Sequence, residues 1–146
     1  MGLSKEHWDC VMSRAYPLLV KRKRKALVKE LEDLTGKAKA AQKVARSARD
    51  LLEDEPNDEN RKAFTDAHNA VQPAINAVEA KKGELEQLAT PFGQMDVFRE
   101  NWDTLSAKNL GAWCDAEELK EAEADLAEQE KAVAEAKAKL AERKRA

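Results

Sequence analysis

Apolar residues recur at alternating steps of four and three along three stretches of this chain. This spacing places them on one face of a helix and is the heptad seam of a coiled coil. It predicts long helices over residues 17–54, 58–89 and 115–146. The first seam comprises Leu27, Leu31, Leu34, Ala38, Ala41, Ala45, Ala48 and Leu52. The second comprises Phe64, Ala67, Val71, Ala74, Val78, Lys81, Leu85 and Leu88, and the third Leu119, Ala122, Leu126, Gln129, Val133, Ala136 and Leu140.

The turn between the first two helices predicts an antiparallel hairpin. Pro56 ends the first helix, and Asn57 and Asp58 supply the cap of the second. Folding the chain about Pro56 places Ala45 opposite Ala67. The two seams then stay in register along the hairpin, because they share one period. We therefore expect the two helices to cover each other's seam.

The third long helix is predicted to begin at a capping box, in which Asp115 is the cap and Glu118 its reciprocal partner. Short connections favour neighbouring helices that run in opposite directions. The expected fold is therefore all-α: an elongated up-down-up three-helix antiparallel bundle, or coiled-coil stalk, within a single domain of residues 1–146.

The remaining segments, residues 1–16 and 91–114, are expected to form a small aromatic-rich helical head on this stalk. Six of the seven aromatic residues belong to these segments, and Ser4 is placed to cap the first short helix. Two interpretations of the aromatic residues stay open. They fill a core, or a subset remains exposed as a recognition patch.

Two tryptophans of the head are expected to differ in burial. Trp102 lies at helical spacing between Phe98 and Leu105, which predicts that its side chain is buried. Trp113 follows Gly111 and precedes the predicted helix cap, so it is expected in an exposed loop, where binding residues are common. The candidate partner-binding residues are Trp113, Phe92, Trp8 and Tyr16.

Composition supports a helical protein and predicts no overall electrostatic attraction to a charged partner. Ala, Glu, Lys, Leu and Arg make up 85 of the 146 residues, which is typical of long helices and disfavours a sandwich, barrel or Rossmann fold. The formal net charge is only −2. No apolar run approaches the length of a membrane span, and no signal-peptide pattern follows the first residue. We therefore expect no membrane partner and a cytoplasmic location.

One basic cluster departs from this balance of charge. Five consecutive basic residues are typical of nucleic-acid binding, although they wrap more than one helical turn and so form no single stripe. The acidic start of the third helix also offers them intramolecular partners. The candidate nucleic-acid contacts are Lys21, Arg22, Lys23, Arg24, Lys25 and Lys29.

Catalytic and metal-binding patterns are nearly missing from the sequence. The two histidines, His7 and His68, fall in different predicted regions, and there is no Glu-x-x-His pair, H-E-x-x-H motif or glycine-rich phosphate loop. His7 and Cys10 lie one helical turn apart, but isolated His and Cys residues on a half-apolar helix are more typical of packing than of zinc binding. We expect no catalytic residue, no metal and no cofactor.

These patterns favour a non-enzymatic protein-interaction module: an adaptor, or an inhibitor or regulator of a larger macromolecular machine. It would bind another protein through its aromatic head, as a monomer or homodimer. One alternative is a helical nucleic-acid-binding protein that uses residues 21–25. The other is a structural coiled-coil oligomer whose leftover seam faces pair between chains.

Overall fold

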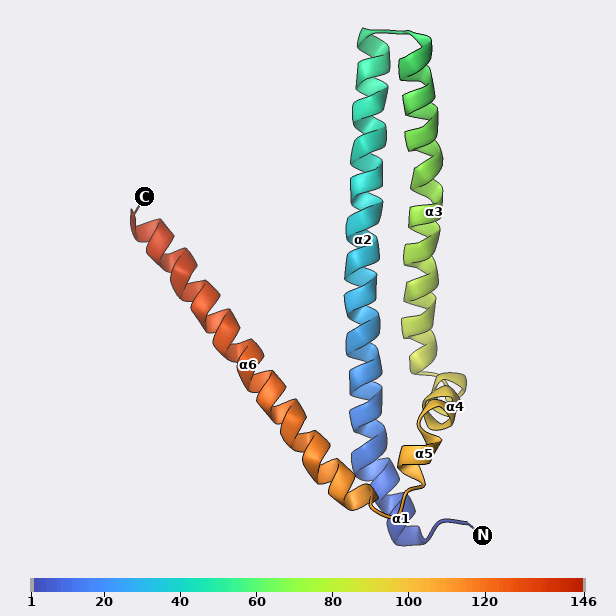
Figure 1. Cartoon of the computed structure of the whole chain (residues 1–146), viewed down its shortest axis with the longest axis vertical. Helices are drawn as coiled ribbons and strands as arrows, with labels where there is room; N and C mark the ends of the chain where they lie inside the picture. The colour runs from blue at the N-terminus through green and yellow to red at the C-terminus, as the bar shows by residue number, and fades with distance from the viewer. Residues whose placement is uncertain (1, 146) are drawn as a thin grey trace. The chain divides into compact units, whose positions relative to one another are not determined.

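The computed structural model describes residues 2–145, and all regular structure in this range is helical (Figure 1). The all-α prediction is confirmed, and none of the described helices is long and apolar enough to cross a membrane. The elements in chain order are α1 (Lys5–Cys10), the π-helical segment η1 (Val11–Ala15), α2 (Tyr16–Asp54), α3 (Asp58–Leu88), α4 (Pro91–Glu100), α5 (Trp102–Leu105) and α6 (Leu110–Arg145).

The chain divides into two compact units. One comprises Met1–Leu18 and Asn101–Ala146, and the other comprises Leu19–Glu100. We call the second the hairpin unit and the first the α6 unit. The residues expected to form one head are shared between them, because α4 belongs to the hairpin unit and α1, η1 and α5 belong to the α6 unit.

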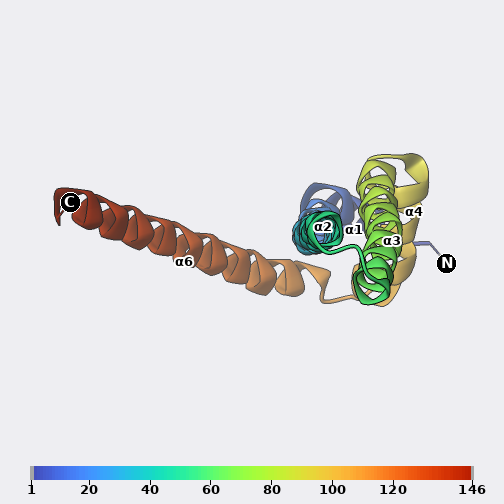
Figure 2. The same ribbon diagram turned by 90° about the horizontal axis from the view of Figure 1, so that it is seen from above.

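In the hairpin unit, α2 and α3 lie side by side and run in opposite directions (Figures 1 and 2). Both helices end within one residue of their predicted bounds, and the side chain of Asn57 caps α3 by accepting a hydrogen bond from the Asn60 amide at 2.8 Å. Lys81 Nζ lies 2.6 Å from Glu30 Oε2 across the hairpin. This ion pair agrees to within one residue with the register that places Ala45 opposite Ala67.

The predicted seams of α2 and α3 are the faces that the hairpin covers. Every predicted seam position from Leu27 to Leu52 in α2, and from Phe64 to Leu88 in α3, is buried or half-buried. Most of the intervening positions are exposed. The heptad pattern therefore identified which side of each helix its neighbour would contact.

A glycine allows α4 to approach the end of α3. Gly93 is buried, and a Cβ atom there would lie 2.2 Å from the carbonyl oxygen of Gln87 and 2.7 Å from Cα of Leu88. Both are backbone atoms that cannot rotate away, so only glycine fits. The turn is held by Thr90, whose hydroxyl donates a hydrogen bond to the Gln87 carbonyl at 2.6 Å.

The α6 unit has an aliphatic core. Its fully buried side chains are not aromatic, whereas its aromatic side chains are half-buried or exposed. Of the two interpretations of the aromatic residues, this favours the one in which a subset remains exposed. Helices α1 and η1 contact α6. The buried core residues of the α6 unit are Val11, Ala15, Leu18, Leu105, Leu110 and Cys114.

Helix α6 begins five residues earlier than the capping box predicted. It starts at Leu110 rather than at Asp115. Leu110 and Cys114 are buried four residues apart, so burial of this face extends the helix toward the N-terminus. Gly111 does not break the helix, because it lies in the first turn, where amides have no intrahelical acceptor.

Beyond its first turns, α6 is uncovered. Every described residue from Leu126 to Arg145 is exposed, and Leu119, the first residue of the predicted third seam, is exposed as well. The packing of a third helix onto the hairpin therefore stays a prediction.

Candidate functional site

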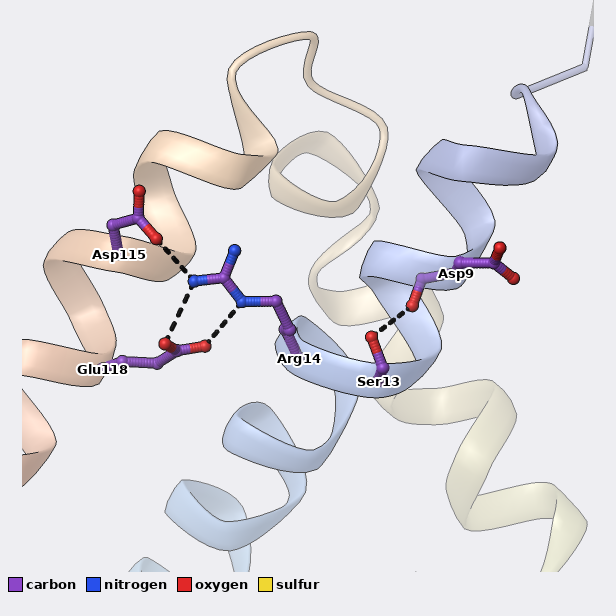
Figure 3. A network of polar contacts seen from close by, with 5 residues as sticks. All are labelled: Asp9, Ser13, Arg14, Asp115 and Glu118. Carbon is purple, nitrogen blue, oxygen red and sulfur yellow. Dashed lines mark hydrogen bonds and ion pairs between the residues drawn. The ribbon is translucent and has the colours of Figure 1, made fainter.

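Two short helical segments near the N-terminus, α1 and η1, position the first surface of interest. Ser4 caps α1 as predicted, because its hydroxyl accepts a hydrogen bond from the His7 amide at 3.1 Å. Helix α1 continues directly into the wider π-helical turn η1, where the Ser13 hydroxyl donates a hydrogen bond to the Asp9 carbonyl at 2.5 Å (Figure 3). π-Helical turns of this kind are frequent at functional sites, because the extra residue changes which side chains share a face.

Two tryptophans from distant parts of the sequence meet at the surface of the α6 unit. The ring centroids of Trp8 in α1 and Trp102 in α5 lie 6.2 Å apart, with their planes tilted by 42°. Aromatic rings at this separation and tilt attract each other through their quadrupoles. Even so, Trp8 is 38% exposed and Trp102 is 44% exposed. Met12, four residues after Trp8, is exposed too. We call these three side chains the Trp patch.

A hydrogen bond of His7 connects α1 to α5, the two helices that carry the tryptophans of the Trp patch. Its Nε2 atom lies 2.5 Å from the carbonyl oxygen of Leu105 and is the donor, since a carbonyl oxygen only accepts. Leu105 is fully buried. The hydrogen bond therefore ties the helix that carries Trp8 to the core beside Trp102, and it limits the relative motion of the two rings.

Arg14 makes the second connection within this unit, to the first turns of α6. Its Nη2 atom donates to Asp115 at 2.5 Å and to Glu118 at 3.0 Å, and its Nε atom donates to Glu118 at 2.9 Å (Figure 3). Hydrogen bonds from the guanidinium lower the pKa of the Glu118 carboxyl. The same bonds raise the pKa of Arg14. Asp115 and Glu118 thus anchor α6 to η1, and the capping role expected for them is wrong.

The two cysteines, whose separation the sequence left open, lie together as free thiols. Burial raises the pKa of Cys114 to about 11, and the neighbouring Cys10, which hydrogen-bonds with it, contributes to the rise. A thiol is nucleophilic only as the thiolate. At neutral pH Cys114 is therefore a protonated core residue with little reactivity.

The four residues that the sequence nominated for partner binding differ in exposure. Trp8 lies in the Trp patch. Phe92, in α4 of the hairpin unit, is 71% exposed, and Met95 one turn later is exposed as well. Tyr16 is half-buried at the start of α2, and Trp113 is half-buried within α6. Among the four, Trp8 and Phe92 present the exposed surface that binding needs.

The expectations for Trp102 and Trp113 were both wrong. Trp102 was expected to be buried, but the helix breaks at Asn101, and α5 begins anew at Trp102. The helical spacing from Phe98 therefore no longer fixes the direction of the Trp102 side chain. Trp113 was expected in a loop, but it lies inside α6, which begins at Leu110. The sequence carried one signal for the break: Asn101 and Asp103 resemble a helix start.

The basic cluster lies in the first third of α2, and part of its charge is paired locally. Lys23 Nζ lies 3.0 Å from Glu100 Oε1, so these two residues join α2 to the end of α4. Lys23 and Arg22 are half-buried, whereas Lys21, Arg24, Lys25 and Lys29 are exposed. The cluster therefore contains one ion pair within the hairpin unit together with several exposed basic side chains.

Among the exposed side chains of the described residues, the rings of Trp8 and Trp102 contact each other. Among residues 2–145, no group of three or more His, Cys, Asp or Glu side chains could hold a metal ion. The grouped features are the Trp patch and the ion pairs that position its helices. Comparison of the chain with protein-family models, with curated proteins and with solved structures finds no match in any of the three.

Proposed function

We propose that this protein is a non-enzymatic interaction module that binds another protein through the Trp patch, as an adaptor or as a regulator of a larger assembly. The observation that carries the proposal is the contact between two exposed tryptophan rings, Trp8 and Trp102. Tryptophan is the residue type most enriched among the side chains that dominate binding energy at protein interfaces.

Exposed tryptophans in contact with each other are costly to keep in water unless a partner covers them. Single exposed apolar side chains are ordinary on protein surfaces, whereas grouped ones mark interaction sites. Met12 adds a flexible thioether side chain, which adapts to the shape of a partner. The Trp patch thus combines two rigid rings with one adaptable side chain.

The surroundings of the Trp patch favour a well-ordered binding surface. The hydrogen bond from His7 to Leu105 and the ion pairs of Arg14 hold the short helices in place. A surface that is already ordered loses less conformational entropy on binding, and more of its contact energy is therefore retained as affinity.

Charged side chains of both signs lie close in sequence to the two tryptophans of the Trp patch. Glu6 and Asp9 lie near Trp8 in the sequence, Asp103 adjoins Trp102, and Lys5 lies one helical turn before Trp8 on the same face; all four charged side chains are exposed. Rim charges contribute mainly to specificity and to the rate of association. We infer that the partner offers an apolar groove with a polar rim.

The test compares capture of proteins from a native lysate by the full chain and by a double variant, Trp8→Ala with Trp102→Ala. We expect at least one protein to bind the wild-type chain and to bind the variant about 30-fold more weakly, as for a loss of about 2 kcal/mol at an interface hot spot. Quantitative mass spectrometry identifies the captured protein, and titration calorimetry of the purified pair measures the affinity.

A matched control separates the Trp patch from general stickiness. Val44→Ala with Leu51→Ala removes two exposed apolar side chains of α2, and this variant should retain the partner. Circular dichroism of each variant checks that the helices persist. Binding that both double variants retain equally would contradict the proposal. Capture that collapses between low and moderate salt and requires intact RNA or DNA would instead support the nucleic-acid alternative, since phosphate contacts are strongly salt-dependent.

A further inference from the structure

Helix α6 carries a stripe of large apolar side chains that no other part of its unit covers. Leu119, Leu126, Val133 and Leu140 recur every seven residues, and each is more than half exposed. Most of the stability of helices in proteins comes from packing of an amphipathic face against another element. An apolar side chain repeated over four heptads on one face is the pattern by which helices pair with other helices.

The hairpin offers no matching stripe. Its two helices already cover each other's seams, as the burial of those positions shows. The large apolar side chains still exposed on α2 are Val28, Val44 and Leu51. The first two are sixteen residues apart, so the three do not form a continuous heptad series. A second α6, by contrast, has a stripe of the same length and period.

We propose that α6 pairs with α6 of a second copy of this chain, and that the two helices run antiparallel. The proposal concerns a surface separate from the Trp patch, so it stands or falls independently of the function proposed above. Its orientation follows from two independent features of α6, the sizes of the seam side chains and the distribution of charge.

The seam side chains pack more evenly when the helices are antiparallel. The large residues occupy one heptad position, and the other seam position holds Ala122, Gln129 and Ala136. In an antiparallel pair the two seam positions face each other, so that Leu126 lies opposite Ala136 and Val133 opposite Gln129. In a parallel pair each position faces itself, and Ala122 would meet Ala122 across a gap. Close packing of large against small side chains favours the antiparallel arrangement.

Charge also distinguishes the two directions. Residues 119–130, beyond the carboxylates that Arg14 binds, contain five acidic residues and one lysine, a net charge of −4. Residues 131–145 contain six basic and two acidic residues, a net charge of +4. An antiparallel pair brings the acidic half of each helix against the basic half of the other, whereas a parallel pair aligns like charges.

The residues that flank the seam repeat this preference position by position. Glu123, Glu130, Lys137 and Lys144 share one heptad position beside the seam. Equivalent flanking positions face each other in an antiparallel pair, which places Glu123 near Lys144 and Glu130 near Lys137. A parallel pair would instead place Lys139 of one copy beside Lys144 of the other. Such flanking charges set partner choice and orientation in coiled coils.

The decisive experiment is sedimentation equilibrium of the full chain over a micromolar to submillimolar concentration series. We expect the wild-type chain to dimerise. The variant Glu123→Lys with Glu130→Lys should dimerise at least about tenfold more weakly, because each copy then opposes lysine to lysine. A second double variant carries Lys137→Glu and Lys144→Glu. Mixing the two double variants should restore a dimer, because opposite charges meet again at every flanking pair.

A matched control keeps the same net charge. Glu135→Lys with Glu142→Lys changes the charge by the same amount at exposed positions away from the seam, and it should leave the dissociation constant within about twofold, since exposed charges that lack a close partner contribute little. Stronger dimerisation of Glu123→Lys with Glu130→Lys would overturn the antiparallel orientation.

A second pair of variants tests the stripe itself. Leu126→Gln with Val133→Gln should abolish the dimer, whereas Ala127→Gln with Ala134→Gln, on the outward face one residue further along, should preserve it. A wild-type chain that remains monomeric throughout the concentration series would overturn the proposal. So would a dimer that Leu126→Gln with Val133→Gln leaves intact.

Discussion

The α2–α3 hairpin and α6 are built from the same pattern and differ in what covers it. All three helices are longer than thirty residues and carry alanine-rich heptad seams. The seam of the hairpin is covered along its whole length, whereas the large seam residues of α6 are exposed. The short turn after Asp54 gives α2 a partner that is always close by, since closing a short loop costs little entropy. A heptad seam thus specifies that a partner helix is needed, while the connections of the chain decide which helix is near enough to serve.

The largest expected effect separates a covered seam residue from an exposed one. Leu88→Ala should lower the free energy of unfolding by about 2–5 kcal/mol, because Leu88 is only 4% exposed and its truncation leaves a cavity. Leu140→Ala, on the exposed stripe, should change it by less than about 0.5 kcal/mol at protein concentrations too low for self-association. Urea unfolding followed by circular dichroism measures both. Equal losses would contradict the contrast between the two seams.

The next effect concerns glycines inside the hairpin unit. Gly93→Ala should destabilise by about 1–3 kcal/mol, because its Cβ atom would overlap backbone atoms at the end of α3. Gly36→Ala, in the middle of α2, meets nothing within 4 Å and should stabilise by about 0.8–1.0 kcal/mol through helix propensity. The melting temperature should therefore fall for Gly93→Ala and rise for Gly36→Ala. A gain in stability from Gly93→Ala would show that the approach of α4 to α3 is looser than described.

The smallest expected effect is a difference in pH response between the two units. Arg14 lowers the pKa of Glu118 in the folded state, so their pairing stabilises above the ordinary carboxyl pKa of 4.5 and is lost as the pH falls below it. In the hairpin, Glu30 and Glu84 raise the pKa of Lys81. That pairing stabilises below the ordinary lysine pKa of 10.5 and is lost as the pH rises above it.

Melting temperatures across pH test this difference with two variants. Arg14→Gln should reduce the loss of stability in acid and leave the alkaline limb unchanged. Lys81→Gln should reduce the loss at alkaline pH and leave the acid limb unchanged. Both pairs are exposed to solvent, so the shifts should be small and should shrink as salt is added. A variant that alters both limbs equally would argue against independent pairings in the two units.

The long helices were predictable because their signals are local. The bounds of α2 and α3, the cap at Asn57 and the covered faces of the hairpin follow from period, capping residues and a proline turn, which involve residues close together in sequence. The cap at Ser4 was predictable for the same reason. The start of α6 was not, because the residues that extend it, Leu110 and Cys114, are helical owing to burial rather than to a local signal.

The Trp patch was only half predictable. Trp8 was nominated from the sequence, but its partner Trp102 was assigned to the core, since the spacing from Phe98 assumes an unbroken helix. The break at Asn101 turned Trp102 to the surface. Met12, the third member of the patch, lies in the π-helical segment Val11–Ala15 and is exposed. Each of these outcomes depends on a shift of one residue in the helical repeat, and helix propensity alone does not determine such a shift.

The sequence by itself determined the helical class, the lengths of the hairpin helices and the side of each that faces its neighbour. Only the tertiary structure decided that the core of the α6 unit is aliphatic, that Trp8 and Trp102 meet at its surface, and that Arg14 anchors α6. The physical reason is the range of the interactions. Helix formation and hairpin register depend on residues within a few turns of one another, whereas the Trp8–Trp102 contact joins residues ninety-four positions apart, and its existence depends on how every intervening element packs.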